Sequence, residues 1–184
     1  AEAEAKEAQM QLLRYQLNPH FLFNTLNSVS ALVTSGRAGD ANKMLLNLST
    51  FLRFSLERES ILMTTLREEL VAVQLYLDIE KVRFSDRLEI HFNIAPEAYR
   101  YAIPSLLLQP LVENALKYAI SKSESGGTIQ ITARVTDASL ELSVDDSGAD
   151  SDDIHISDRE PLSNAGIGLG LQNIRERLET CFGS

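Results

Sequence analysis

The chain has 184 residues, enough for one sizeable domain or two small ones. Lys and Arg total 17 and Asp and Glu total 26, and the net charge of −9 argues against general nucleic-acid binding because like charges repel a polyanion. A single cysteine, Cys181, excludes an intramolecular disulfide, and no apolar run reaches the roughly 18–20 residues that span a bilayer. We expect a soluble, cytoplasmic chain, or the cytoplasmic part of a longer membrane protein.

The first third of the chain is predicted to form two helices. Residues 1–14 are rich in strong helix formers, and a helical stripe of apolar residues continues to Val33. Pro19 lies inside this stripe and predicts a bend just before His20, because proline has no N–H to donate. Residues 35–40 indicate a turn. The apolar face predicted for the second helix consists of Met44, Leu45, Leu48, Phe51, Leu52 and Leu56. Such a hairpin cannot cover its own stripe, so we expect a second copy to complete a four-helix bundle.

The remainder of the chain alternates between helix and strand patterns. Thr65 to Glu68 fits a capping box and predicts a helix to about Phe84. The elements predicted after it are a strand at 88–94, a mostly apolar helix at 103–120 that Pro110 bends, hairpin strands at 128–135 and 139–144, a polar loop at 145–165 and a last helix at 169–178. The fold class is therefore α+β, a helical hairpin followed by an α/β sandwich.

The run Gln16 to Asn24 places His20 and Asn24 four residues apart in a helical segment. Residues at this spacing share one face of a helix, so the two side chains are expected to point the same way. An ordinary imidazole is largely neutral at pH 7 and has a nitrogen lone pair that can attack phosphorus. The alternative for a lone histidine is packing or capping within a helix bundle, and the flanking pattern favours the phosphoacceptor.

Three weaker motifs follow in the second half. Residues 111–118 place Glu113, Asn114 and Lys117 on the apolar helix, where an amide oxygen can bind Mg²⁺ and an ammonium can bind phosphate. Solvent-facing polar residues are the alternative. Residues 144–148 put a carboxylate at a strand end, which can accept a hydrogen bond from an exocyclic amine; an acidic turn is the alternative. Residues 166–173 have three alternate glycines that can admit a polyphosphate to backbone N–H groups, or form a simple hinge.

The order of these motifs resembles that of the two-component sensor histidine kinases of the LytS/YehU type. The run from Gln16 to Asn24 is similar to their phosphoacceptor signature almost residue for residue, and residues 76–84 and 103–117 resemble their characteristic stretches. Asp146 to Gly148 and Gly166 to Gly170 resemble the G1 and G2 boxes of the GHKL ATPase fold. The resemblance covers nearly the whole chain.

The resemblance implies a role for each of these positions. His20 would be the phosphoacceptor, and Asn24 would align water for dephosphorylation of a partner. Asn114 would hold Mg²⁺ with Glu113 near the metal or its waters. The residues implied in ATP binding are Asn114, Lys117, Tyr118, Asp146 at adenine N6, Gly148, and Gly166, Gly168, Gly170 and Leu171 of a mobile lid.

The sequence departs from the family pattern at two positions. Asp150 replaces the second glycine of the G1 box, and Phe21 follows His20 where many other histidine kinases have an acid, which leaves the general base unassigned. Relatives also continue with further strands beyond Gly183, so we expect this chain to be a fragment. Two alternatives stay open, namely a GHKL ATPase or serine kinase without an acceptor histidine, and a non-catalytic dimeric scaffold.

We therefore predict a histidine kinase core that uses ATP and Mg²⁺. Residues 1–62 would form the dimerisation and phosphotransfer hairpin, and residues 63–184 the ATP-binding domain. The expected partners are a second copy of the chain and a response-regulator protein, whose aspartate receives the phosphoryl group and which the kinase can also dephosphorylate. No nucleic acid is expected, and a membrane is expected only through an upstream sensor region.

Overall fold

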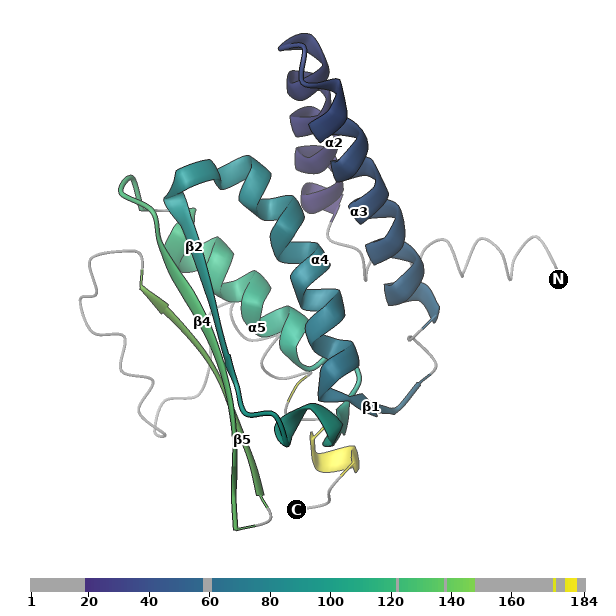
Figure 1. The fold of residues 1–184 in the computed structure, drawn as a ribbon, viewed down its shortest axis with the longest axis vertical. Coiled ribbons are helices and arrows are strands. Elements are labelled where there is room, and N and C mark those ends of the chain that lie inside the picture. Colours follow the sequence, from purple (N-terminus) through teal and green to yellow (C-terminus); the bar gives the residue numbers. More distant parts are fainter. Residues whose placement is uncertain are drawn as a thin grey trace, which may run out of the picture.

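The computed structural model describes residues 19–57, 61–121, 123–137, 139–147, 174 and 178–181. Within them a helical hairpin precedes a mixed layer of helices and strands (Figure 1). The elements in chain order are α2 (Pro19–Thr34), α3 (Ala38–Glu57), β1 (Met63–Thr65), α4 (Leu66–Phe84), η1 (Ser85–Arg87), β2 (Leu88–Ile94), η2 (Ala98–Arg100), β3 (Ala102–Pro104), α5 (Leu108–Ala115), η3 (Leu116–Ile120), β4 (Gly127–Thr136) and β5 (Ser139–Ser147). This confirms the predicted α+β fold class.

The hairpin of α2 and α3 is close to the prediction. The turn is shorter than expected because α3 begins at Ala38, and Gly36 adopts a φ of +76° there. Met44, Leu48 and Phe51 are buried as predicted, whereas Leu45 and Leu56 of the predicted face are exposed. The bend predicted before His20 involves residues outside the described part of the chain.

The capping box predicted at the start of α4 is present. The Thr65 hydroxyl accepts the Glu68 backbone N–H at 3.4 Å, and Glu68 Oε2 accepts the Thr65 N–H at 3.1 Å. Two N–H groups that an isolated helix start would leave unpaired are thus satisfied. The helix ends at Phe84 as predicted, and Ser85 follows with a φ of +51°.

The main sheet has the strand order β2-β4-β5. β2 runs parallel to β4, and β4 runs antiparallel to β5. The predicted strands at 88–94, 128–135 and 139–144 are confirmed. The predicted loop began too early, because Asp145 to Ser147 continue β5 and pair with β4, with Asp146 opposite Ile129. Of the last helix predicted at 169–178, Ile174 and Leu178 are described and helical, and Glu179 to Cys181 are helical beyond its predicted end.

The helix predicted from Ile103 begins later, at Leu108. Residues 102–104 instead form β3, which pairs antiparallel with β1 and places Ile103 opposite Thr64. Extended backbone suits Ile103 because the following proline disfavours the helical conformation. Pro110 lies in the first turn of α5, where its missing N–H costs nothing, so the bend predicted at Pro110 is wrong. The last five residues of the predicted helix, Leu116–Ile120, form a π-helical turn.

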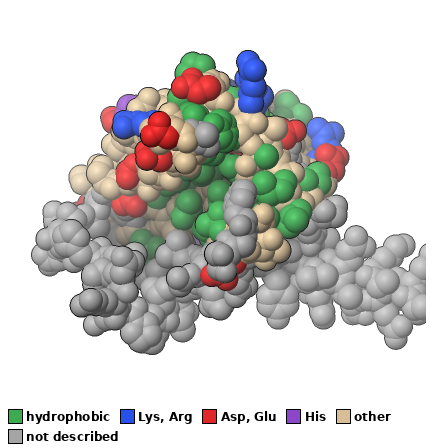
Figure 2. Space-filling view, turned by 90° about the horizontal axis from the view of Figure 1, so that it is seen from below, with side chains coloured by type: hydrophobic (Ala, Val, Ile, Leu, Met, Phe, Trp, Pro, Cys, Tyr) green, Lys and Arg blue, Asp and Glu red, His purple; other side chains and the backbone are tan. Residues whose placement is uncertain are grey.

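One apolar core joins the hairpin to the sheet layer. α4 and α5 cover one face of the sheet, and the hairpin packs on α4 (Figure 1). The Phe21 ring lies 4.8 Å from the Tyr76 ring and 5.6 Å from the Phe51 ring, measured between centroids. At the end of the molecule away from the hairpin turn, hydrophobic side chains reach the surface among scattered acidic and basic ones (Figure 2). The aromatic contact on α4 holds the first turn of α2 in place, and with it His20.

Candidate active site

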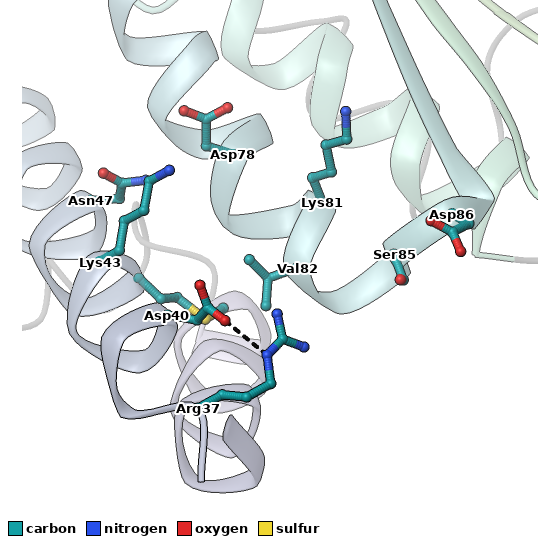
Figure 3. Close-up of a pocket in the computed structure, with 10 residues that line it drawn as sticks. Arg37, Asp40, Lys43, Asn47, Asp78, Lys81, Val82, Ser85 and Asp86 are labelled. Carbon is teal, nitrogen blue, oxygen red and sulfur yellow. Dashed lines mark hydrogen bonds and ion pairs between the residues drawn. The ribbon is translucent and has the colours of Figure 1, made fainter. Parts of the chain in front are cut away.

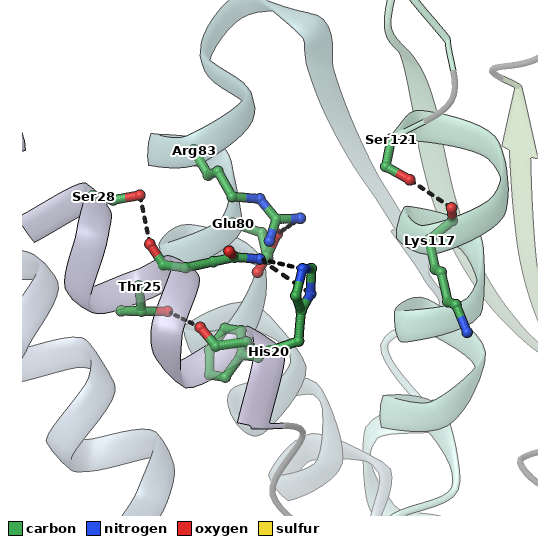
Figure 4. A network of polar contacts seen from close by, with 9 residues as sticks. His20, Thr25, Ser28, Glu80, Arg83, Lys117 and Ser121 are labelled. Atoms are coloured by element: carbon green, nitrogen blue, oxygen red, sulfur yellow. Dashed lines mark hydrogen bonds and ion pairs between the residues drawn. The ribbon is translucent and has the colours of Figure 1, made fainter.

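A cavity of about 470 Å³ lies where α2, α4 and α5 meet. It brings His20 together with Glu113, Asn114 and Lys117, although these residues are roughly a hundred positions apart in the sequence. Figure 4 shows His20 of α2 beside Glu80 and Arg83 of α4, with Lys117 of η3 and Ser121 on the opposite side. The lining consists of His20, Phe21, Tyr76, Glu80, Arg83, Glu113, Asn114, Leu116, Lys117 and Ser121.

His20 and Asn24 contact each other across one turn of α2, as their spacing predicts. The amide nitrogen of Asn24 lies 3.1 Å from Nδ1 and 3.3 Å from Nε2 of the His20 ring. An amide N–H can only donate, so the contact is a hydrogen bond when one ring nitrogen lacks a proton. The first turn is anchored by the buried Phe21, whose carbonyl accepts the Thr25 hydroxyl at 2.8 Å.

Glu80 on α4 is a buried carboxylate in this cavity, with 2% of its surface exposed. The guanidinium nitrogen Nη2 of Arg83 lies 2.6 Å from Glu80 Oε2, within ion-pair distance. Burial raises the pKa of the Glu80 carboxyl to about 7, Arg83 opposes the rise, and Glu113 adds to it. The carboxyl therefore exchanges its proton near neutral pH.

The sequence analysis gave no role to Glu80 or Arg83. A signal was present, because Tyr76, Glu80 and Arg83 recur at i, i+4 and i+7 and so share one face of α4. Ordinarily such a face would be exposed or wholly apolar. That it is buried beside His20 follows from the packing of the hairpin on α4, which spacing alone does not reveal.

α5 supplies the predicted residues Glu113 and Asn114, the following turn η3 supplies Lys117, and all three line the cavity. Gln109 donates to Glu113 Oε1 at 2.8 Å, and burial raises the pKa of the Glu113 carboxyl. Asn114 is half-buried and Lys117 is exposed. Tyr118 does not line the cavity; its ring centroid lies 4.9 Å from the Lys117 ammonium.

Glu69 positions the start of α5 from the neighbouring helix α4. Its buried carboxylate accepts the backbone N–H groups of Leu106 at 2.7 Å, Leu107 at 3.1 Å and Leu108 at 3.3 Å. These are the N–H groups that a helix start leaves without partners, and the negative charge also complements the helix dipole. Sequence analysis missed this residue, because the capping group comes from 37 to 39 positions away.

The donor set on α5 fits a magnesium–triphosphate group. Mg²⁺ is commonly held by one or two protein oxygens together with substrate phosphates, and Asn114 and Glu113 offer such oxygens beside the Lys117 ammonium. Within the described part of the chain, no group of three or more His, Cys, Asp or Glu side chains is placed to hold a metal on its own.

The remaining residues predicted to bind the nucleotide either do not line this cavity or lie outside the described residues. Asp146 is exposed on β5 and does not line the cavity, and partial burial together with Asp145 raises the pKa of its carboxyl. The glycines and leucine predicted to contact ATP lie outside the described residues, as does Asp150; they are Gly148, Gly166, Gly168, Gly170 and Leu171.

A second cavity, of about 390 Å³, lies between the hairpin turn and the end of α4 (Figure 3). Arg37 and Asp40 form an ion pair of 2.8 Å at its edge, with 63% and 51% of their side chains exposed. Its other charged residues include both signs, and no residue predicted from the sequence as part of the site lines it.

Among the described helices, none is long and apolar enough to cross a bilayer.

Comparison with known proteins agrees with this geometry. A family model described as histidine kinase matches residues 8–88, and one described as histidine kinase-, DNA gyrase B- and HSP90-like ATPase matches residues 103–184. The chain is 37% identical to the sensor protein LytS of Staphylococcus haemolyticus, 35% to the sensor histidine kinase YesM of Bacillus subtilis and 36% to the sensor histidine kinase BtsS of Escherichia coli K12. These matches cover 97%, 97% and 96% of this chain and 31%, 30% and 30% of the relatives. The chain thus spans about a third of the length of the curated relatives it matches.

Proposed function

The chain belongs to the histidine kinase family, and we propose that it is a catalytic core that transfers the γ-phosphoryl group of ATP to His20. The observation that carries this proposal is the shared cavity of His20, Glu113, Asn114 and Lys117. The histidine comes from the segment matched by the histidine kinase model, residues 8–88, and the polar residues come from the segment matched by the ATPase model, residues 103–184. A packed structural histidine would not need these neighbours.

ATP is the phosphoryl donor in this proposal. The match to the ATPase family implies ATP binding by residues 103–184. Asn114, with Glu113 beside it, would hold Mg²⁺, which when bound neutralises charge on the phosphates. Lys117 would contact phosphate oxygens, and Asp146 would accept a hydrogen bond from the adenine amine. The predicted glycines from Gly148 to Gly170 would complete the nucleotide site.

His20 acts as the nucleophile through one ring nitrogen. Phosphoryl transfer depends mainly on positioning and charge neutralisation, and Phe21 packed on Tyr76 fixes the helix turn that carries the ring. The Asn24 amide donates a hydrogen bond to a ring nitrogen and so orients the ring before transfer. Asn24 would later align a water when a phosphorylated partner is dephosphorylated.

The acceptor and the ATP-binding residues belong to the same chain, so we propose phosphorylation within one subunit. The hairpin also keeps large apolar side chains exposed while its other face packs on α4. We propose that a second copy covers them, with residues 1–62 as the dimerising hairpin and residues 63–184 as the ATP-binding domain. The exposed apolar residues are Phe23, Leu26, Val33, Leu45, Leu46 and Leu56.

The phosphoryl group would pass from His20 to an aspartate of a response-regulator protein. A cytoplasmic location, and a membrane only through an upstream sensor region, remain part of the proposal.

Incubation with radiolabelled ATP and Mg²⁺, followed by acid and base treatment, tests the proposed activity. We expect acid-labile, base-stable label that is lost in His20→Gln and retained in the matched control His91→Gln, whose side chain is exposed on β2. Acid-stable label would indicate serine or threonine phosphorylation, and label that persists in His20→Gln would contradict the assignment.

A further inference from the structure

Phosphorylation of a neutral imidazole leaves a proton to be removed. One ring nitrogen forms the bond to phosphorus, and the other still carries its hydrogen, so the ring would become a cation. The residue after His20 is Phe21, which is buried against Tyr76 and has no proton acceptor. Among the described residues, the candidates for the base are the other side chains that line the cavity.

We propose that Glu80 on α4 is the general base that accepts the ring proton of His20 during phosphorylation. This inference rests on the proposed function. Phe21 packs on Tyr76 at 4.8 Å between ring centroids, which places the first turn of α2 against the face of α4 that carries Glu80 one turn after Tyr76. Both His20 and Glu80 line the cavity, and Figure 4 shows them entering it from α2 and α4.

The surroundings of Glu80 suit a base that works near neutral pH. A buried carboxylate is costly unless a cation or hydrogen bonds compensate it, and Arg83 at 2.6 Å supplies a partial compensation. The titratable and charged groups that share the cavity with it are His20 from α2, Tyr76 and Arg83 from α4, Glu113 from α5 and Lys117 from η3. A pKa near 7 gives the carboxyl both a deprotonated form that can accept a proton and a protonated form that is stable afterwards.

The other polar groups in the cavity fit this role less well. Glu113 already accepts a hydrogen bond from Gln109 at 2.8 Å and is adjacent to Asn114, the proposed metal ligand. The Asn24 amide donates to the ring and has no basic nitrogen. Lys117 and Arg83 are cations that cannot accept a proton in their charged forms. Of the two carboxylates that line the cavity, Glu80 is therefore the better candidate for the base.

The step balances in atoms and electrons. The lone pair of one ring nitrogen forms the N–P bond, replacing the hydrogen bond from Asn24, and the bond from γ-phosphorus to the bridging oxygen breaks. ADP leaves with that electron pair. The proton on the other ring nitrogen passes to a Glu80 oxygen, directly or through a water in the cavity. The ring ends as a neutral phosphoimidazole, and the carboxylic acid later releases its proton to solvent.

The test measures initial rates of His20 labelling between pH 5.5 and 8.5 for the wild type, Glu80→Gln and Glu80→Asp. General acid–base catalysis contributes about 10²–10⁴-fold, so we expect Glu80→Gln to lose about 100-fold or more in rate at saturating ATP with unchanged ATP affinity. Glu80→Asp should recover part of the rate. Asp40→Asn, which alters the exposed ion pair with Arg37, is the matched control and should label like the wild type.

The pH profile separates a base from a structural carboxylate. The carboxyl must lose its proton before it can act as the base, so below the pKa of Glu80 the slope of log rate against pH should be greater by about 1 in the wild type than in Glu80→Gln. Arg83→Gln offers a second test that keeps the carboxylate. Since Arg83 lowers the pKa of Glu80, its removal should move the acidic limb of the profile to higher pH.

Two results would overturn the role of Glu80 and leave the histidine kinase assignment intact. One is a Glu80→Gln protein that labels His20 at the wild-type rate. The other is a slower variant whose profile keeps the wild-type slope, which would mean a structural effect. Circular dichroism checks the fold of each variant, and if Glu80→Gln does not fold, Arg83→Gln decides: an unmoved acidic limb rejects the proposal. A wild type that never labels on His20 would instead reject the proposed function.

Discussion

Two ion pairs with the same spacing line the two cavities along α4. Glu80 and Arg83 lie three residues apart beside His20, and Arg37 and Asp40 lie three residues apart at the hairpin turn. Their closest nitrogen–oxygen distances are alike, 2.6 Å and 2.8 Å. Their burial differs, since Glu80 is 2% exposed and Asp40 is 51% exposed.

This difference in burial decides what each pair can do. An exposed pair gains little because water screens it, typically about 0–1 kcal/mol. A buried carboxylate loses hydration, so its proton equilibrium moves toward neutral pH and it becomes available for proton transfer. Two acid–arginine pairs that look equivalent in the sequence thus have different chemistry because the hairpin covers only one of them.

The largest effect on stability is expected at a second buried carboxylate, Glu69. Its partners include three backbone N–H groups at the start of α5. Glu69→Ala would leave these groups without their acceptor, and we expect a loss of about 3 kcal/mol or more in the free energy of unfolding. Chemical denaturation measures it.

The control for Glu69 is Glu89→Ala on β2, where the side chain is 71% exposed. We expect a change within about 0.5 kcal/mol there. A similar loss of unfolding free energy in both variants would show that burial does not decide how much a carboxylate contributes to stability.

A somewhat smaller effect is expected in the pH dependence of stability. The Glu80 pKa is about 7 in the folded chain and near 4.5 when unperturbed, so between these values the folded state holds a proton that the unfolded state has lost. Its contribution is full below pH 4.5 and is lost as pH rises through 7. At 1.36 kcal/mol per pKa unit, the unfolding free energy of wild type relative to Glu80→Gln should fall by about 3 kcal/mol between pH 4.5 and 8.

The variant difference is needed because burial also raises the pKa values of Glu113 and Asp146, which act in the same direction. Asp40→Asn gives the corresponding difference for the exposed pair, and we expect it to change with pH by less than about 1 kcal/mol. A pH-independent difference between wild type and Glu80→Gln would contradict the buried, neutral-range carboxyl.

Much of the fold was predictable because its signals are local. The capping box at Thr65 and the alternation at 88–94 and 128–135 specify a helix start and strands through nearby residues alone. The short pair of β1 and β3 was missed, since three-residue strands carry little pattern and depend on a partner some forty positions away. The π-helical turn after Ala115 also has no simple sequence signature.

The same distinction applies to the site. His20, Asn24, Glu113, Asn114 and Lys117 were predicted because each lies in a recognisable run. The structure brings His20, Glu113, Asn114 and Lys117 to one cavity, and Asn24 contacts the His20 ring. Glu80 was missed because its significance comes from burial by a helix pair elsewhere in the chain.

The most direct test of the central claim, that acceptor and ATP-binding residues form one site within one chain, is a mixing experiment. His20→Gln and Asn114→Ala chains, each first shown to be inactive alone, carry different tags and are co-expressed, and pull-down verifies their association. Labelling with ATP and Mg²⁺ follows. We predict no label in the mixed species, because neither chain has both halves of a site. Acid-labile label on the Asn114→Ala chain would show that one chain phosphorylates the other and would contradict the account.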